Sequence, residues 1–522
     1  MRRLPQLLAA ACALLLASCA DRNDGIPAEL REIMRAGRAI ALPPLHPDFA
    51  ELSALLLTPN LSAETDARIA EIVMRIDPAG SLTHQRQVVD ARRLQEFLSH
   101  EEIIEEINFL FDLLRYGYGA YQYFGGDDVF LPLRDSMLER LAGMDDPMQV
   151  SSYLFDFLVP SLSGTIADNH FWIHTSGFAA PSYVALMSED FVLRRAGNDL
   201  VREFLGETYR LVETTLRDGT PVEGVLPTLT RDGEFAFAFG RFAPLADPLA
   251  RDLIAIFECA STGIRHSQEV RLARPGDYAP QASEPQANAP ASRVLLPTRE
   301  VDGVTVMENR TMAVTVSAFG SAVREFFLAG RDIRENPLVV LDLRGHNGGF
   351  TRLGEEWIRG YTGQLPLGEL SFVMHSLRSA TTMRRLEANA LSASEIRDEP
   401  AWIQGSTFDY GAALELLPNA GLVIVLMDNH LFSAGELFIG YLRQLENALF
   451  VGTNTRGTLV TTGIARTRLP HSGLDMYFGM TLNLRPDLSR FEGVGFLPDL
   501  WVPPQESLER VLAFIERYGL NR

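Results

Sequence analysis

The fold of this chain is decided by Pro337-Leu-Val-Val-Leu-Asp-Leu-Arg-Gly-His-Asn-Gly-Gly349 and Gly421-Leu-Val-Ile-Val-Leu-Met-Asp-Asn-His-Leu-Phe-Ser433. Each stretch begins with a continuous apolar run, which is typical of a strand that is buried on both faces of a parallel sheet. The first run ends in a glycine-rich turn that can point backbone N–H groups at an anion. The second ends in a serine just before a helical pattern over 434–447. An anion pocket and a nucleophile at the carboxyl ends of neighbouring strands are what acyl transfer needs.

Ser433 has two interpretations. At a helix N-terminus, unpaired N–H groups and the helix dipole stabilise negative charge on or beside the serine oxygen, which suits a nucleophile. Serine is also a favoured N-cap residue, worth about 1 kcal/mol. From the serine alone the cap is favoured, and the glycine turn together with a glutamate motif downstream shifts the preference to the nucleophile.

Three motifs carry a family resemblance. They are Asp342-Leu-Arg-Gly-His-Asn-Gly-Gly349, Ser433-Ala-Gly-Glu436 and Glu492-Gly-Val-Gly-Phe-Leu-Pro-Asp499. In this order they resemble the C-terminal-processing and tricorn-core family of serine peptidases, over roughly the last 220 residues and a short stretch near His170. The resemblance implies an α/β fold with a mainly parallel-sheet β-β-α spiral core (ClpP/crotonase-like) and a peptide or protein substrate. We expect no cofactor.

The resemblance also assigns roles. Gly348 or Gly349 would supply one N–H group of the oxyanion pocket, and the Ala434 amide the second. Glu492 would be the acid that orients the base. Glu436 is interpreted as a helix-start acid favoured by the dipole, and Asp342 and Arg344 are expected to pair beneath the glycine turn.

The base is expected to be His170, which lies in Asp168-Asn-His170 and resembles the family's Leu-x-Asp-Gly-His segment. An imidazole titrates near neutral pH and can accept the serine proton. Asn169 stands where some relatives carry serine, and its amide could orient the ring. A buried structural histidine is the alternative, in which case His346 or His430 would be the next candidates.

The chain contains no lysine, and all 47 of its basic residues are arginine. A Ser–Lys dyad and a Schiff-base lysine are therefore excluded. The C-terminal-processing branch of the family is known for a lysine base, and Thr458 of Thr455-Arg-Gly-Thr458 stands in its place here. His346 likewise replaces a family asparagine.

Composition predicts a globular protein of several domains. The chain has 522 residues, of which 46% are hydrophobic and 22% charged, and a formal net charge of −20. That charge argues against nucleic acid and anionic membrane surfaces as partners. We expect a signal peptide, a helical N-terminal domain that carries the base, a mixed or β-rich module, a linker and a serine peptidase core, over 1–19, 20–175, 176–277, 278–294 and 295–522.

The N-terminal sequence is typical of a lipoprotein signal. Two arginines precede a short apolar run that ends in Leu16-Ala-Ser-Cys19, which resembles a bacterial lipobox. This pattern implies acylation of Cys19 and a lipid anchor in the cell envelope, and Ala20 resembles the pattern sorted to the periplasmic face of the outer membrane. An ordinary secretory signal is the alternative. Cys259 would then be a lone cysteine, which we expect to be buried.

Two other functions compete with a lipid-anchored serine endopeptidase. The missing lysine, Asn169 and His346 are compatible with a non-catalytic lipoprotein that binds peptides or scaffolds an envelope complex. An α/β-hydrolase esterase is disfavoured, because Leu431 replaces the first glycine of Gly-x-Ser-x-Gly. A metal site is also disfavoured, because His170 and His174 lack a third ligand at useful spacing.

Overall fold

The structure is a computed structural model. It describes residues 25–38, 46–48, 51, 94–275, 295–366, 372–374, 403–404, 415–485 and 487–521. Cys19, the signal peptide and the linker 278–294 lie outside these residues. Within them, no helix combines the length and apolarity needed to cross a bilayer.

The central sheet has six strands in the order β12-β13-β14-β17-β18-β21. All neighbours from β13 to β21 are parallel, and β12 joins the edge as an antiparallel strand. Every residue of β14, β17 and β18 is buried, as the unbroken apolar runs predict. The bounds are β12 (Thr298–Val301), β13 (Val304–Glu308), β14 (Leu338–Asp342), β17 (Leu422–Met427), β18 (Ala448–Gly452) and β21 (Leu500–Trp501).

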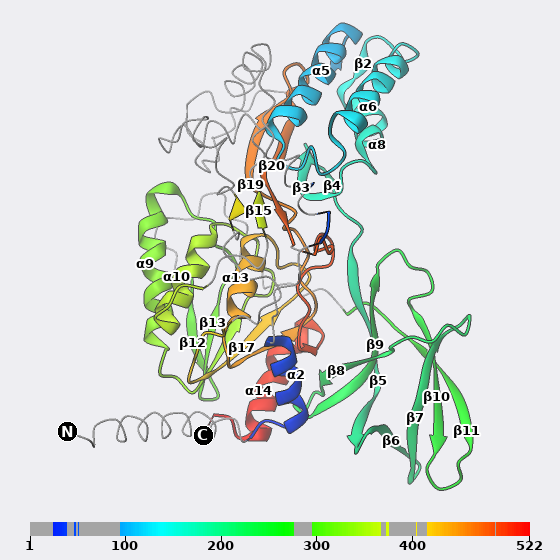
Figure 1. Ribbon diagram of the computed structural model, residues 1–522, viewed down its shortest axis with the longest axis vertical. Coiled ribbons are helices and arrows are strands. Elements are labelled where there is room, and N and C mark those ends of the chain that lie inside the picture. The colour runs from blue at the N-terminus through cyan, green and yellow to red at the C-terminus, as the bar shows by residue number, and fades with distance from the viewer. Residues whose placement is uncertain are drawn as a thin grey trace, which may run out of the picture.

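Helices cover both faces of this sheet (Figure 1). On β14, Val339 and Leu341 pack against α9, α10 and α13, whereas Leu338 and Val340 pack against α2 and α14. This alternation is the period-2 geometry of a strand with a core on each side. The mixed α/β class is therefore confirmed. The helices are α2 (Ala28–Arg38), α9 (Val316–Asp332), α10 (Thr351–Thr362), α13 (Ala434–Leu442) and α14 (Ser507–Tyr518).

A second sheet joins the N-terminal and C-terminal parts of the chain. Its order is β16-β15-β20-β3-β4, and β19 pairs with β20 outside that path. Helices α5 (His100–Gly117) and α6 (Gly126–Leu141) share one apolar core with β3, β4, β19 and β20. The strands are β3 (Asp168–Ile173), β4 (Ser176–Phe178), β15 (Phe372–Met374), β16 (Ile403–Gln404), β19 (Thr461–Arg468) and β20 (Asp475–Leu484).

The segment around His170 is thus a strand rather than part of a helical unit. Trp172 and Ile173 of β3 pair with Tyr477 and Met476 of β20. Sequence-local patterns miss this strand because its partner lies about 300 residues further along the chain. The pairing brings His170 close to the C-terminal hairpin β19–β20.

Residues 183–271 form an antiparallel sheet of seven strands in the order β11-β10-β7-β6-β5-β9-β8, which stands to one side of the molecule in Figure 1. Cys259 ends β10 and is 7% exposed, so its predicted burial is confirmed. The strands are β5 (Tyr183–Ala196), β6 (Asp199–Phe204), β7 (Glu207–Leu216), β8 (Val225–Leu229), β9 (Phe235–Pro244), β10 (Asp252–Cys259) and β11 (Arg265–Arg271).

Candidate active site

Ser433 sits on a sharp turn between β17 and α13. Its backbone has φ 56° and ψ −124°, a conformation that L-residues rarely adopt. The Ser433 N–H group donates to Thr458 Oγ1 at 2.7 Å and to Glu436 Oε2 at 3.2 Å. Strain of this kind costs about 1–3 kcal/mol and persists only where the surroundings enforce it. Here these two hydrogen bonds hold the turn.

The glycine turn lies directly against this serine. A Cβ atom added to Gly348 would be 3.1 Å from Ser433 Cβ, so a side chain there would crowd the hydroxyl. The Gly348 N–H group donates to His346 Nδ1 at 3.0 Å. By contrast, the amides of Gly349 and Ala434 donate to no other described residue. Of the two glycines considered, Gly349 is therefore the better oxyanion donor.

His346 packs against the glycine turn. It is fully buried, and a Cβ atom on Gly435 would be 2.5 Å from His346 Nδ1. Burial lowers the pKa of the imidazole to about 3, so the ring is neutral at physiological pH. Because its acceptor nitrogen already binds Gly348, His346 is unsuited to be the base.

Asp342 and Arg344 pair beneath the turn as predicted. Arg344 Nε and Nη2 lie 2.9 and 2.7 Å from the two Asp342 oxygens, and Arg310 Nη2 adds a contact of 2.7 Å. Burial disfavours the charged carboxylate, but the two guanidinium groups outweigh this and lower the Asp342 pKa to about 2. The pair fixes the end of β14.

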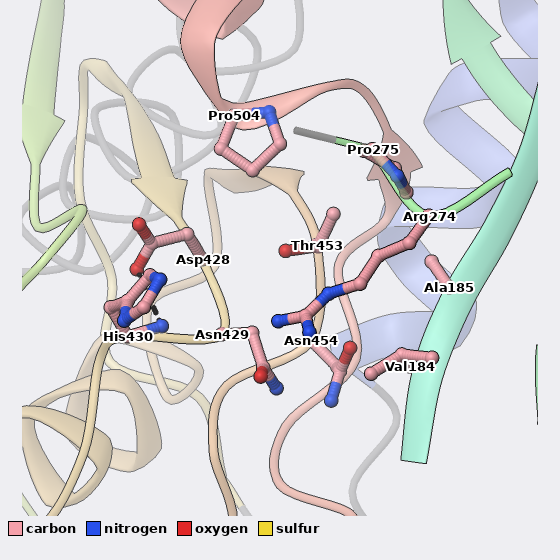
Figure 2. A pocket seen from close by; sticks show the side chains of 10 residues that line it. All are labelled: Val184, Ala185, Arg274, Pro275, Asp428, Asn429, His430, Thr453, Asn454 and Pro504. Atoms are coloured by element: carbon pink, nitrogen blue, oxygen red, sulfur yellow. Dashed lines mark hydrogen bonds between the residues drawn. The ribbon is translucent and has the colours of Figure 1, made fainter. Parts of the chain in front are cut away.

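Asp428 fixes the equivalent position after β17. Its Oδ1 accepts from the backbone amides of Gly345 at 2.9 Å and His430 at 3.1 Å. Figure 2 shows Asp428 and His430 beside a small cavity, with Arg274 reaching in from the other side. The cavity measures about 20 Å³, which is room for one water molecule rather than a substrate side chain.

One loop, residues 457–461, holds three buried carboxylates. Of these carboxylates, only Glu492 is predicted from the sequence to belong to the site. The contacts of Glu436 and Asp168 are not predicted, because their donors are backbone amides or threonine hydroxyls that lie far away in the sequence. The contacts are Gly457 N and Thr458 N to Glu436 (both 2.7 Å), Leu459 N and Val460 N to Glu492 (3.0 and 2.9 Å), and Thr461 Oγ1 to Asp168 (2.8 Å).

Thr458 occupies the position where the resemblance places a lysine. Its hydroxyl accepts from the Ser433 amide and donates to Glu436 Oε2, both at 2.7 Å. The interpretation of Glu436 as a simple helix-start acid is therefore incomplete. Glu436 is fully buried and also accepts from Thr455 Oγ1 at 2.6 Å, and burial raises its pKa.

His170 approaches the same loop from β3. Its backbone N–H donates to Asp168 Oδ1 at 2.8 Å, and its ring Nδ1 is buried without a hydrogen-bond partner among the described residues. Burial lowers the pKa of the His170 imidazole, while Asp168 and a hydrogen bond with the Thr461 backbone oppose that shift. The ring is therefore neutral near pH 7, as a general base must be.

Asn169 and Glu492 are joined to each other. The Asn169 amide nitrogen donates to Glu492 Oε1 at 2.8 Å, and its side-chain Nδ2 donates to the Gly457 carbonyl at 2.7 Å. Burial and the nearby Asp168 raise the pKa of Glu492 well above its usual value. In the described part of the chain, no hydrogen bond joins the His170 ring to Ser433 or Glu492. The 457–461 loop connects the three groups, and the catalytic roles of Ser433, His170 and Glu492 stay predictions.

We expect Glu436→Ala to lower the free energy of unfolding by roughly 3 kcal/mol or more, because several buried donors would lose their acceptor. Glu446→Ala, at an exposed position after α13, is the matched control and should change stability by less than about 0.5 kcal/mol. Chemical denaturation of both variants measures the difference. Equal stability of the two variants would show that Glu436 does not hold the loop.

A serine on a strained strand-to-helix turn, with unpaired amides beside it, is the arrangement expected of a serine hydrolase. Residues 310–502 match the model for Peptidase family S41, which indicates a serine peptidase. A search of curated proteins found no match to this chain.

Solved structures to which this chain is similar include mature CPAF, with 14% identity, a TM-score of 0.38 and coverage of 80% of this chain and 96% of that one. The photosystem II D1 C-terminal processing protease has 14% identity, a TM-score of 0.34 and coverage of 79% and 97%. For the tricorn protease the values are 14%, 0.33, 81% and 37%. At this identity and TM-score these likenesses carry no conclusion about the site.

Proposed function

We propose that the chain is a serine endopeptidase that cleaves peptide bonds through an acyl-enzyme on Ser433, with His170 as the base and Glu492 as the acid that orients it. The observation that most supports this proposal is the set of hydrogen bonds made by the 457–461 loop. The loop contacts the Ser433 amide through Thr458, Glu492 through two amides, and the β3 strand of His170 through Asn169.

In the proposed reaction these groups act in sequence. Ser433 Oγ attacks the substrate carbonyl carbon and transfers its proton to the neutral imidazole of His170. The negative oxygen that forms is stabilised by the Gly349 and Ala434 amides. The imidazolium then protonates the leaving amine, and water hydrolyses the acyl-serine by the same route.

Glu492 has a defined task in this scheme. Its carboxylate is buried, and burial raises its pKa, so a positive charge beside it is what most favours its ionised form. Formation of the His170 imidazolium supplies that charge. The unpartnered Nδ1 of His170 is the atom that would donate to Glu492 when substrate is bound.

The parallel order β13-β14-β17-β18 supports a ClpP/crotonase-like β-β-α spiral for the catalytic core. A test of the function is to incubate the mature chain with unfolded envelope proteins and to map the new termini by mass spectrometry. Internal cuts that are absent with Ser433→Ala are expected. Removal of single terminal residues alone would contradict the endopeptidase assignment.

We also propose that Cys19 carries a lipid that anchors the mature chain in the cell envelope, at the periplasmic face of the outer membrane. The lipobox Leu16-Ala-Ser-Cys19 supports this placement, and envelope proteins or peptides would then be the substrates. Cys19→Ala is expected to move the protein from the membrane fraction to the soluble fraction, or to stall its processing. A soluble wild-type mature protein without acyl chains by mass spectrometry would contradict the anchor.

A further inference from the structure

A second cavity, of about 110 Å³, lies between α13, which follows the proposed nucleophile, and the segment that contains Glu492. One wall is the face of α13 that carries Leu437, Gly440 and Tyr441. The Leu437 amide donates to the Ser433 carbonyl at 3.2 Å, so this wall begins one helical turn from the serine. The cavity therefore lies against the helix that begins directly after the proposed nucleophile.

The opposite wall is formed by Glu492 and by residues that contact it or lie next to it in the chain. Leu459 and Val460, whose amides bind Glu492, line the cavity, and Glu492 itself lines it as well. Phe491 and Phe496 complete the wall, with ring centroids 4.9 Å apart at an interplanar angle of 70°. The lining is thus mainly apolar and aromatic, as is common in sites that bind small apolar groups.

Two polar features mark the cavity as a binding site rather than a packing defect. Asn483 is 7% exposed, and its Oδ1 is buried without a partner among the described residues, while its Nδ2 donates to the Leu459 carbonyl at 2.7 Å. A buried acceptor without a donor is costly, and a ligand N–H group would satisfy it. Arg485 and Arg490 also line the cavity, and their positive charge disfavours a basic ligand.

We infer that this cavity is the subsite that receives a large apolar side chain of the substrate, such as leucine, methionine or phenylalanine, next to the scissile bond. This inference rests on the proposed function and adds a substrate class to it. A dry cavity of roughly 150 Å³ holds benzene, so a partly open space of 110 Å³ has the size for these side chains. Asn483 Oδ1 would accept a hydrogen bond from a backbone amide of the same peptide, and basic side chains would be rejected.

Gly440 is the position that tests this inference. A Cβ atom there would meet only Phe496 Cζ, at 3.4 Å, so alanine fits in ordinary contact and leucine would fill the cavity. The matched control is Gly320→Leu on the exposed surface of α9, where an added Cβ has nothing within 4 Å. Peptides that differ only in one residue, phenylalanine or alanine, are the substrates, and kcat/KM is measured for each.

We expect Gly440→Leu to lower kcat/KM for the phenylalanine peptide about tenfold or more and to leave the alanine peptide within about twofold, because apolar pockets discriminate on this scale. Gly440→Ala, which should fold normally, is expected to show a smaller change in the same direction. Gly320→Leu should change neither value. Equal losses for both peptides, or no change in either, would overturn the subsite.

A binding measurement separates this inference from the proposed function. Fluorescence anisotropy of the same labelled peptides with Ser433→Ala protein needs no turnover. The phenylalanine peptide should bind at least tenfold more tightly than the alanine peptide, and Gly440→Leu in the same background should remove the difference. Equal binding of the two peptides would overturn the subsite even if cleavage depends on Ser433. Selective binding without any cleavage would retain the subsite and overturn the peptidase mechanism.

Discussion

Ser433→Ala is expected to lower kcat by about 10⁴-fold or more without unfolding the protein. Loss of a nucleophilic serine removes the covalent route, and only substrate binding and the oxyanion pocket then remain. The hydrogen bonds that hold the turn use the Ser433 backbone amide, which alanine retains. Loss of the hydroxyl as a cap should cost only about 1 kcal/mol.

The check on this variant combines peptide hydrolysis with chemical denaturation. The amides of Gly349 and Ala434, which we propose as the oxyanion donors, stay in place, so substrate binding should change little. Residual cleavage equal to that of the wild type would show that another group attacks the substrate. A complete loss of folding would instead show that the hydroxyl has a structural role that the hydrogen bonds do not reveal.

His170→Gln is expected to lower kcat/KM by about 10³-fold or more, and wild-type activity should depend on pH through this residue. A base must be neutral to accept the serine proton, and burial lowers the His170 pKa below 6.5. Activity is therefore full at neutral pH and falls as pH drops below 6.5 and the ring becomes protonated. The midpoint of this fall in activity should therefore lie below pH 6.5, the reference pKa of histidine.

A pH–rate profile of kcat/KM measures this midpoint directly. His471→Gln is the matched control, because His471 contacts Glu105 at the surface and lies outside the proposed site. That variant should keep the wild-type profile. A midpoint at or above pH 7 in the wild type, or full activity in His170→Gln, would contradict the assignment of His170 as base.

The central sheet is predictable from sequence because its signal is local. Unbroken apolar runs predict β14 and β17, and both form within one residue of the expected bounds. The helix after Ser433 is also predictable, although α13 ends at Leu442 rather than Asn447. There the chain turns back, and the Asn447 amide donates to the Asn419 side chain at 2.9 Å.

The hydrogen bonds that support the site could not be predicted, because they join residues that are far apart in the sequence. Asp168 and Thr461 are 293 positions apart, yet their side chains hydrogen-bond in the folded protein. The amides that bind Glu436 and Glu492 belong to Gly457, Thr458, Leu459 and Val460. The side chains of these residues give no indication that their backbone binds carboxylates. Motif resemblance could point to Glu492, but only folding shows that it binds a loop rather than a single partner.

The central claim is that Ser433 is a nucleophile activated by His170. The most direct test is to label the mature protein with a fluorophosphonate at pH 7.5 and to identify the modified peptide by mass spectrometry. We expect one phosphonylated residue, Ser433, with labelling abolished in Ser433→Ala and strongly slowed in His170→Gln. Labelling at another serine, or none in a wild-type protein that is folded, would contradict the claim and favour a peptide-binding lipoprotein without catalysis.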